Sequence, residues 1–463
     1  MKIELNGIND SLLTGIIAKY SSQISKLKNM LGRFALDKKH IPIYNRKFVI
    51  DGVEQLDLVN HPAHIDFVGN IVNTKIGYLF GNPLDVVIED KTSQQFIYDF
   101  MQRVYFDDVI AEIGTQAAVC GIGAGLLYLN KDGQADITAI SPENIIFIGE
   151  NILNLDLAIR FYSAEEIVND KFVTYDYAEC YDKTHYKVLR IKHEKNNQTW
   201  EMFQEETLHG FNDIPIILFK NNDLMQGDCE NCLDSMDAYD RVFTDEVCDI
   251  EQYRMDYLVI KGDLGENAAE ETRKLKRMRV MYLKNDSDGK NTQDAYFITR
   301  LLPIEKIDAT LNRIKKEIYE MSRHLNVSDD SMGGQASGVA LKNKQAPFEY
   351  KCLEAEREFK ASLVKMFKVL CEFWAMSRQA NIDYTKIDFI FTRNYAQNKV
   401  EEADVLLKLA SVLPLEKAIE LSSFDLDIKE VMELIEDKKN DEAEKLKNEM
   451  LRMEKEQDET VEE

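Results

Sequence analysis

The sequence predicts an α+β protein, in which a first half rich in strands is followed by long helices. Seven short segments of strand-like composition follow one another between about residues 124 and 220, with turn residues between them. Two long helical segments, 228–256 and 303–327, then enclose a small mixed unit, and a third helix covers 337–380. Strands and helices thus occupy separate parts of the chain, which is typical of the α+β class.

Length and composition set the broad class. With 463 residues the chain is too long for one ordinary domain, and about three units are expected. A hydrophobic content of 44% is enough for a packed core and argues against disorder. No run of about 18 apolar residues is present, so we expect no membrane span, and the first residues lack a signal core, so we expect no export. The seven cysteines are scattered and odd in number, which favours a reducing compartment.

The formal net charge of −25 limits the kinds of partner. A protein that grips nucleic acid over a broad surface needs Lys and Arg to neutralise phosphates, so the charge argues against that class. It does not argue against a protein past which nucleic acid must slide, because a negative wall repels phosphates and prevents sticking.

The first half begins with helices and continues with strands. Apolar spacing predicts helices over 9–35, 62–79 and 93–120, whereas 41–50 reads as extended. The predicted strands are 125–130, 135–140, 144–149, 171–181, 186–194, 199–204 and 214–221.

The segment 228–256 is predicted to be one acidic helix, roughly 42 Å long at 1.5 Å per residue. Helical spacing places five of its acids on one stripe. These are Glu230, Asp234, Asp237, Asp245 and Asp249. The stripe is interpreted either as a solvated helix face or as a wall that faces something negative.

A small mixed unit follows, with strands expected at 257–262, 279–284 and 295–300 and a helix at 266–277. The next helix opens at Pro303, and its apolar residues recur every three or four positions, which is a heptad seam. The seam residues are Ile304, Ile307, Leu311, Ile314, Ile318, Met321 and Leu325. This pattern indicates helix–helix association within the chain or between copies, and the basic residues Lys306, Arg313, Lys315, Lys316 and Arg323 could pair with acids on a neighbouring subunit.

The last third is predicted to be mainly helical. The helix 337–380 contains Pro347, which should interrupt and kink it. A strand is expected at 386–393 and helices at 399–412 and 415–421. The acidic tail from 430 has helical composition but few apolar residues, which favours a solvated or frayed helix.

The stretch "DDSMGGQASGVALKNK" before the third helix raises the question of phosphate binding. A nucleotide-hydrolase loop needs G-x-x-x-x-G-K-[ST] after a strand, whereas Gly334 and Gly338 lead into valine and follow a helix. The pattern therefore argues against nucleotide binding. Two interpretations remain: a flexible connector in which Ser337 caps the next helix, or a mobile loop whose Lys342 and Lys344 touch a backbone phosphate loosely.

No other motif assembles a catalytic or metal site. Cys229 and Cys232 form a single CxxC pair with no second pair for zinc, so they are interpreted as incidental thiols. The histidines are dispersed, and no nucleophile elbow, zinc-protease helix or calcium loop occurs. We therefore expect no catalytic residues, no metal and no cofactor.

Five stretches along the chain resemble, in the same order, segments of a known family. They are "NTKIGYLFGNPLDV" (73–86), "AAVCGIGAGLLYLNKDGQADITAISPENIIFI" (117–148), the segment 210–253 that begins "GFNDIPIILFKNN", "SDDSMGGQASGVALKNK" (328–344) and "IDFIFTRNYAQNKVEEADVLLKL" (387–409). The family is the portal proteins of tailed bacteriophages, in particular those of long-tailed phages of Gram-positive hosts.

The resemblance implies the portal fold, with an α/β wing, a two-helix stem, a small α/β clip, a long kinked helix and a helical crown. The implied boundaries are 1–227 for the wing, 228–256 and 303–327 for the stem helices, 257–302 for the clip, 328–340 for the tunnel loop, 341–398 for the long wing helix and return strand, and 399–463 for the crown and acidic tail.

The resemblance also implies a function without catalysis. Such proteins form a ring, here expected to be a dodecamer, at one capsid vertex, and double-stranded DNA passes through it during packaging and ejection. Implied partners are the terminase large subunit, a head-completion or adaptor protein, and the major capsid and scaffolding proteins. The implied location is the virion, after assembly in the host cytoplasm. Gly333, Gly334 and Gly338 would give backbone freedom to a loop that narrows the channel.

Two alternatives of other classes stay open. One is a nucleic-acid-dependent ATPase, which the missing phosphate loop disfavours. The other is a coiled-coil scaffold or adhesin from a prophage or host, which would form fibres or dimers and not closed rings.

Overall fold

The structure is a computed structural model that divides into two compact units, Met1–Asn394 and Tyr395–Glu463. The residues that it describes are 5–47, 49–50, 53–54, 60–149, 155–193, 199–253, 257–262, 280–284, 294–298, 303–326, 338–394, 406–414 and 417–418. Helices and antiparallel sheets occupy largely separate stretches of the chain, so the α+β class is confirmed.

The chain begins with the short helix η1 (Leu5–Gly7) and the long helix α1 (Asp10–Phe34), as the spacing predicts. Asn9 caps α1, because its side-chain oxygen accepts a hydrogen bond from the Leu12 N–H at 2.9 Å. The extended prediction for 41–50 is wrong in its first part, where η2 (Pro42–Asn45) forms a 3₁₀ turn. Pro42 explains the difference, since its fixed φ favours the first position of a helical turn. Strands β1 (Val49–Ile50) and β2 (Val53–Glu54) pair next.

Three helices then precede the sheets. Helix α2 (Phe67–Phe80) begins five residues later than expected, where Asp66 caps it through the Gly69 N–H. The predicted helix 93–120 is two helices, α3 (Lys91–Arg103) and α4 (Phe106–Cys120). The break falls at Tyr105, whose φ of 51° is left-handed and ends helical geometry.

Five of the described strands form one antiparallel sheet in the order β10-β9-β8-β7-β6. Their bounds are β6 (Ile145–Gly149), β7 (Leu155–Val168), β8 (Lys171–Tyr181), β9 (His185–Lys192) and β10 (Glu201–Leu208). The sequence predicts all of these except β7. Ala164, Glu165 and Glu166 in β7 favour a helix locally, and pairing with β8 from Ala158 to Val168 overrides that preference.

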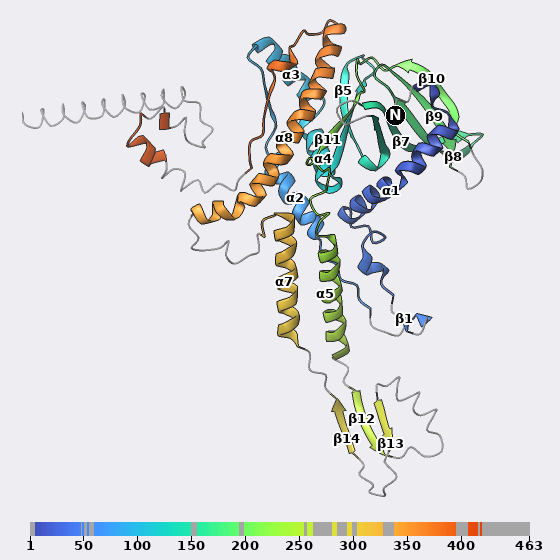
Figure 1. Cartoon of the computed structure of the whole chain (residues 1–463), viewed down its shortest axis with the longest axis vertical. Coiled ribbons are helices and arrows are strands. Elements are labelled where there is room, and N and C mark those ends of the chain that lie inside the picture. Colours follow the sequence, from blue (N-terminus) through green and yellow to red (C-terminus); the bar gives the residue numbers. More distant parts are fainter. Residues whose placement is uncertain are drawn as a thin grey trace, which may run out of the picture. The chain divides into compact units, whose positions relative to one another are not determined.

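A second, three-stranded sheet has the order β11-β4-β5. Its strands come before and after the five-stranded sheet in the sequence, and they are β4 (Ile122–Leu129), β5 (Ala135–Ile140) and β11 (Ile216–Lys220). Figure 1 shows α1 against the five-stranded sheet and α4 and α8 near β5 and β11. The core under α1 contains Leu13, Ile16 and Ile159. The larger core joins α3, α4, α8 and β11 and is centred on aromatic side chains such as Trp374, with Phe367 and Phe219.

Helices α5 (Leu233–Tyr253) and α7 (Ile304–Ser322) lie side by side (Figure 1). They run in opposite directions, since the Asn231 side chain before α5 donates to the Met321 carbonyl at the end of α7, at 2.8 Å. Helix α5 begins five residues later than expected. Residues 229–232 form turns instead, because the Asp228 N–H donates to the Ala118 carbonyl and both cysteines are buried in the core.

The heptad seam of α7 is buried only in part. Leu311 and Ile318 are buried, and Ile307 and Ile314 are half-buried, whereas Ile304 and Met321 are exposed. A straight α-helix drifts away from a strict heptad repeat, so the outermost seam positions turn away from the partner helix. The helix ends at Ser322, and Leu325 therefore lies beyond it.

The remaining elements agree largely with expectation. The predicted strands β12 (Tyr257–Gly262), β13 (Val280–Lys284) and β14 (Asp294–Ile298) form one sheet, and the helix expected at 266–277 lies outside the described residues. Helix α8 (Gly338–Met376) continues through Pro347, so the predicted interruption is wrong, but Figure 1 shows the first turns of α8 at an angle to the rest, as the predicted kink requires. A proline there removes one hydrogen bond, and packing of the following turns against the core retains the helix.

Strand β15 (Asp388–Ile390) pairs with β3 (Asp85–Val87), within the predicted strand 386–393. In the second unit, residues 406–410 are helical, as predicted for 399–412, and the tail from 430 lies outside the described residues. No described helix is long and apolar enough to cross a bilayer.

Gly121 holds the end of α4 against the loop that leads to α5. Its φ is +83°, and a Cβ there would come within 2.1 Å of the Met225 carbonyl oxygen. Its own carbonyl accepts a hydrogen bond from the Asn221 N–H at 2.9 Å. A side chain at this position meets both backbone strain and a backbone clash.

We expect Gly121→Ala to lower the free energy of unfolding by roughly 2 to 4 kcal/mol, because the left-handed strain and the backbone clash add. The matched control is Gly133→Ala, where φ is +71° but the space around the Cβ is open. That variant should lose about 1 kcal/mol. Urea unfolding followed by circular dichroism measures both, and equal losses would contradict the role of the clash.

Candidate functional site

A cluster of buried charges joins three parts of the chain. The Lys75 ammonium of α2 and the Lys351 ammonium of α8 lie 3.1 and 3.0 Å from the same carboxylate oxygen, Oδ1 of Asp228. Asp228 and Lys75 are each only 2% exposed. Lys75 falls on the apolar stripe of α2, three residues after Val72 and four before Leu79, so the helix carries it into the interior.

Asn221 completes the cluster from the end of β11. Its side-chain oxygen accepts from Lys75 at 2.7 Å, and its amide nitrogen donates to Asp228 at 3.0 Å and to the Gln226 carbonyl at 2.9 Å. Buried charges are tolerated only when paired and hydrogen-bonded. The network meets that requirement for one carboxylate oxygen, while Oδ2 of Asp228 accepts no hydrogen bond from the described residues.

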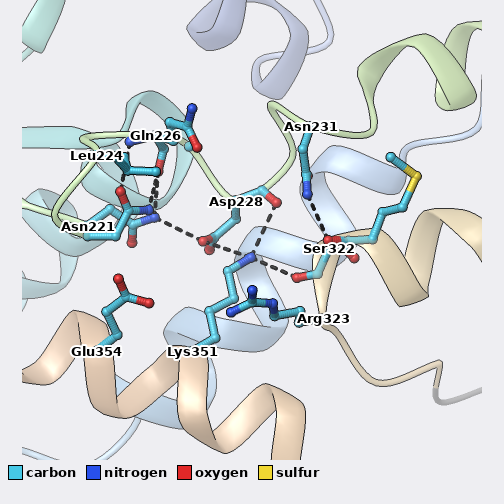
Figure 2. A pocket seen from close by; sticks show the side chains of 12 residues that line it. Asn221, Leu224, Gln226, Asp228, Asn231, Ser322, Arg323, Lys351 and Glu354 are labelled. Atoms are coloured by element: carbon cyan, nitrogen blue, oxygen red, sulfur yellow. Dashed lines mark hydrogen bonds and ion pairs between the residues drawn. The ribbon is translucent and has the colours of Figure 1, made fainter.

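Lys351 also holds the two antiparallel helices at one end. Figure 2 shows its side chain between Asp228 and Ser322. Its ammonium donates to the Ser322 carbonyl in the last turn of α7 at 2.8 Å, and to the Asp228 backbone carbonyl at 3.3 Å. A helix C-terminus leaves carbonyls without partners, and a cation there is favoured. One side chain of α8 thus fixes both the approach to α5 and the end of α7.

The pKa shifts in the cluster have two causes: the groups are buried, and two lysines face one aspartate. Burial alone would raise the pKa of Asp228, but the charges of Lys75 and Lys351 outweigh it and hold the pKa well below its usual range. Burial lowers the pKa of Lys351, and the Asp228 carboxylate opposes that shift. Burial, with the charge of Lys351, lowers the pKa of His324 to about 4, so His324 is neutral near pH 7.

A cavity of about 200 Å³ opens beside the cluster. Figure 2 shows that Lys351 forms part of the cavity wall, and that Arg323 and Glu354 lie on different sides of Lys351. Asn231 and Met321 also line the cavity. It therefore lies where the approach to α5, the end of α7 and one face of α8 meet.

The predicted acidic stripe of α5 is largely paired with cations from the beginning of the chain. Arg33 binds Asp237 through two hydrogen bonds of 2.8 and 2.9 Å. Lys26 contacts Glu230, and Arg46 lies 2.7 Å from Asp245. Asp234 is exposed and Asp249 half-buried. Glu230, Asp237 and Asp245 are thus among the stripe acids that contact cations of the same chain, and the wall facing a negative partner stays a prediction.

The same face of α5 receives a second set of contacts that the sequence did not reveal. The His64 ring lies 2.6 Å from Asp240, which also accepts from the Ile65 N–H. The Thr244 hydroxyl accepts from the Ala63 N–H and donates to the Ala63 carbonyl. The first 65 residues therefore cover one whole side of α5.

Most of the glycine-rich stretch lies outside the described residues. Gly333, Gly334 and Ser337 lie outside the described residues, and Gly338 is the first residue of α8. Lys342 is helical, but its side chain is not among those described. Lys344 is exposed and lines a second cavity, of about 350 Å³, together with Arg323 and Lys316. Their predicted contact with DNA remains a prediction.

The CxxC thiols are buried and unbridged, and the Cys232 sulfur donates to the Cys229 carbonyl at 3.3 Å. Among the described residues, the ligand atoms of Asp182, His185 and Glu206 lie within 4.8 Å of one another. Asp182 already accepts the N–H groups of Thr184 and His185 in a turn, which accounts for its position without a metal.

Sequence reasoning missed the buried cluster. In the sequence, Asp228 is only one acid of a predicted helix. Its two lysine partners are 153 and 123 positions away. The one local signal is Lys75, a charged residue on an otherwise apolar helical stripe.

We expect Asp228→Asn to lower the free energy of unfolding by roughly 3 to 5 kcal/mol, since it leaves two buried lysines without a counter-charge. Asp223→Asn is the matched control, because Asp223 is exposed and contacts Lys220 and Arg357 weakly. It should change stability by less than about 0.5 kcal/mol. Urea unfolding compares the two, and similar small effects would show that the cluster contributes little.

The low pKa of His324 predicts an acid dependence of stability. Between pH 6.5 and about 4 the unfolded chain binds a proton at His324 that the folded chain does not, so stability is complete above pH 6.5 and decreases below it. The loss by pH 4 should be about 3 kcal/mol. Asp228 adds to the acid dependence of stability only below this pH range, because its pKa in the unfolded chain is 3.8.

Unfolding midpoints at pH 7 and pH 4.5 measure this dependence. The His324→Gln variant should show a smaller difference between the two pH values than the unmodified chain. His193→Gln, at an exposed histidine, should retain the full difference. An unchanged slope in His324→Gln would refute the assignment.

Comparison with known proteins agrees with this architecture. Residues 16–445 match the family model described as "Phage portal protein, SPP1 Gp6-like". The chain is 26% identical over 425 residues to the portal protein of Bacillus phage SPP1, covering 88% of this chain and 82% of that protein. It is 29% identical over 391 residues to the portal protein of Clostridium phage phiCD119, covering 81% and 84%. Because the family match spans most of its length, the chain belongs to the SPP1 Gp6-like family of phage portal proteins.

Proposed function

We propose that copies of this chain form a closed ring at the unique vertex of a phage capsid, and that double-stranded DNA passes through the ring during packaging and ejection. The observation that carries the proposal is the extent of the family match, residues 16–445. The match includes the sheets, the helix pair α5–α7, the small sheet between them and α8, so the proposal rests on the whole architecture and not on one motif.

The parts of the ring are assigned as follows. Residues 1–227 form the wing, 228–256 and 303–327 the stem, 257–302 the clip, and 328–340 the tunnel loop. Residues 341–398 return through the long helix to the wing, and 399–463 form the crown and tail. Two antiparallel helices that enclose a small sheet in the sequence support this order.

The charge of the chain suits a channel and not a tight binder of DNA. A net charge of −25 repels phosphates, so a duplex would pass without sticking. Lys342 and Lys344 would make the weak phosphate contacts, and Gly333, Gly334 and Gly338 would let the loop move. In this proposal the protein has no catalytic residues and no cofactor, and a terminase supplies the work of packaging.

The partners follow from position at the vertex. The clip would meet the terminase large subunit and later a head-completion or adaptor protein, and the wing would meet the major capsid and scaffolding proteins. The protein would reside in the virion after assembly in the host cytoplasm.

The second candidate is a coiled-coil scaffold protein without a channel, which the heptad pattern of α7 suggests. Negative-stain images of the purified protein separate the two candidates. Closed rings with a central hole are expected for the portal, whereas fibres or dimers would favour the scaffold.

We expect replacement of Gly333 and Gly334 by proline to leave ring assembly intact but to reduce the DNA packaged per particle, because proline fixes the backbone of the loop. Complementation of a portal-deficient phage followed by measurement of capsid DNA tests this. Alanine at both positions is the milder control. Normal packaging in the proline variant would refute the gating role.

A further inference from the structure

Helix α5 has three sides, and two of them are already covered. One side, with Met236 and Tyr239, joins the core shared with α7. The second, with Asp237, Asp240 and Thr244, contacts the first 65 residues. The third consists of Asp234, Ala238 and Arg241, which recur at helical spacing and are exposed or half-buried. We call this third side the outer stripe of α5.

Arg323, directly after α7, is an exposed cation in an unusual position. Its φ of 56° is left-handed, which a non-glycine residue adopts at a cost, and its side chain is exposed. The His324 N–H closes the helix on the Tyr319 carbonyl at 3.0 Å and holds that geometry. Within the described part of the chain, the Arg323 guanidinium pairs with no acid.

Asp234 is the acid of the outer stripe that stands at the same end of the helix pair. The hydrogen bond from Asn231 to the Met321 carbonyl places the first turn of α5 beside the last turn of α7. Asp234 is exposed, and none of the described cations pairs with it, whereas Asp237 and Asp245 each bind an arginine. Each copy therefore has Arg323 and Asp234 at the same end of the helix pair, Arg323 directly after α7 and Asp234 in the first turn of α5.

The surroundings of Arg323 resemble the core of a protein interface. Leu224 and Met321 are 74% and 44% exposed. Leu224 and Met321 line the cavity of about 200 Å³ that Arg323 also lines. Exposed apolar side chains with charged groups at their rim mark association sites. DNA does not suit such a surface, because it would bury apolar side chains against phosphates.

We propose that a second copy of this chain covers this surface, with Arg323 of one copy opposite Asp234 of the next. The contact uses two different surfaces of the chain, the end of α7 and the outer stripe of α5, so it is head-to-tail and repeats around a closed ring. The inference rests on the proposed ring function, and it names the residues that set the contact between neighbours.

Charge reversal tests the pairing. Arg323→Asp and Asp234→Arg each place like charges together and should lower the fraction of protein in rings by about tenfold or more near 0.1 M salt. The double variant, which restores opposite charges, should recover the rings. Lys28→Glu, at an exposed lysine of α1, is the control and should have no effect. Thermal unfolding checks that each variant folds, and light scattering after size exclusion measures the rings.

A second acid provides the internal comparison. Glu354 also lines the cavity and has no described cation partner. The double variant Arg323→Asp with Glu354→Arg should stay defective. Recovery with Glu354→Arg and none with Asp234→Arg would overturn the proposed pairing.

Cross-linking tests the head-to-tail arrangement. All seven native cysteines are buried, so Arg323→Cys with Asp234→Cys adds the exposed thiols. Mild copper-catalysed oxidation should give a ladder of chains on a non-reducing gel, whereas each single variant should stay monomeric, because its thiol faces no second thiol across a head-to-tail contact. A product limited to monomers or dimers would overturn the inference.

The outcomes separate the two levels of the argument. If negative stain shows rings but the double-cysteine variant gives no cross-linked ladder, the proposed contact between Arg323 and Asp234 is wrong and the proposed portal function stands. If the unmodified chain forms no rings, the proposed function and the interface fail together.

Discussion

The pairing of Asp228 with Lys75 and Lys351 is the constraint on which the rest of the structure depends. A buried carboxylate is tolerated only where cations meet it at close range, so α2, the approach to α5 and α8 must converge at one point. Lys351 extends the constraint to α7 by binding the Ser322 carbonyl. The geometry of one aspartate thus sets where both antiparallel helices leave the part of the chain that contains the sheets.

Pairing of opposite charges also explains how the structure contains a helix with as many acids as α5. Arg33 and Arg46 neutralise Asp237 and Asp245, and His64 meets Asp240, so the first 65 residues shield one side of α5. What remains exposed is a narrower outer stripe than the sequence suggests. For the proposed ring, this division matters more than the net charge, because only side chains that stay unpaired within the chain are left for the proposed channel or for a neighbouring copy.

The family and the order of elements were accessible from the sequence, and the mistakes have local causes. Strand β7 was missed because its Ala-Glu-Glu segment prefers a helix in isolation, and β8 supplies the pairing that overrides it. The apolar spacing predicts the start of α5 five residues early, since nothing in it shows that the Asp228 N–H donates to the Ala118 carbonyl. Pro347 predicts an interruption and a kink, and the helix bends but continues through it.

By itself, the sequence determined the α+β class, the long helices on either side of a small sheet, and the resemblance to portal proteins. These depend on periodicity and composition, which are local properties. Only the tertiary structure decided which acids are paired, which seam residues are buried, and that Asp228 is the centre of the junction. The physical reason is distance along the chain: its lysine partners are 153 and 123 residues away, so no spacing rule connects them. Burial, which makes their charges matter, exists only once the chain has folded.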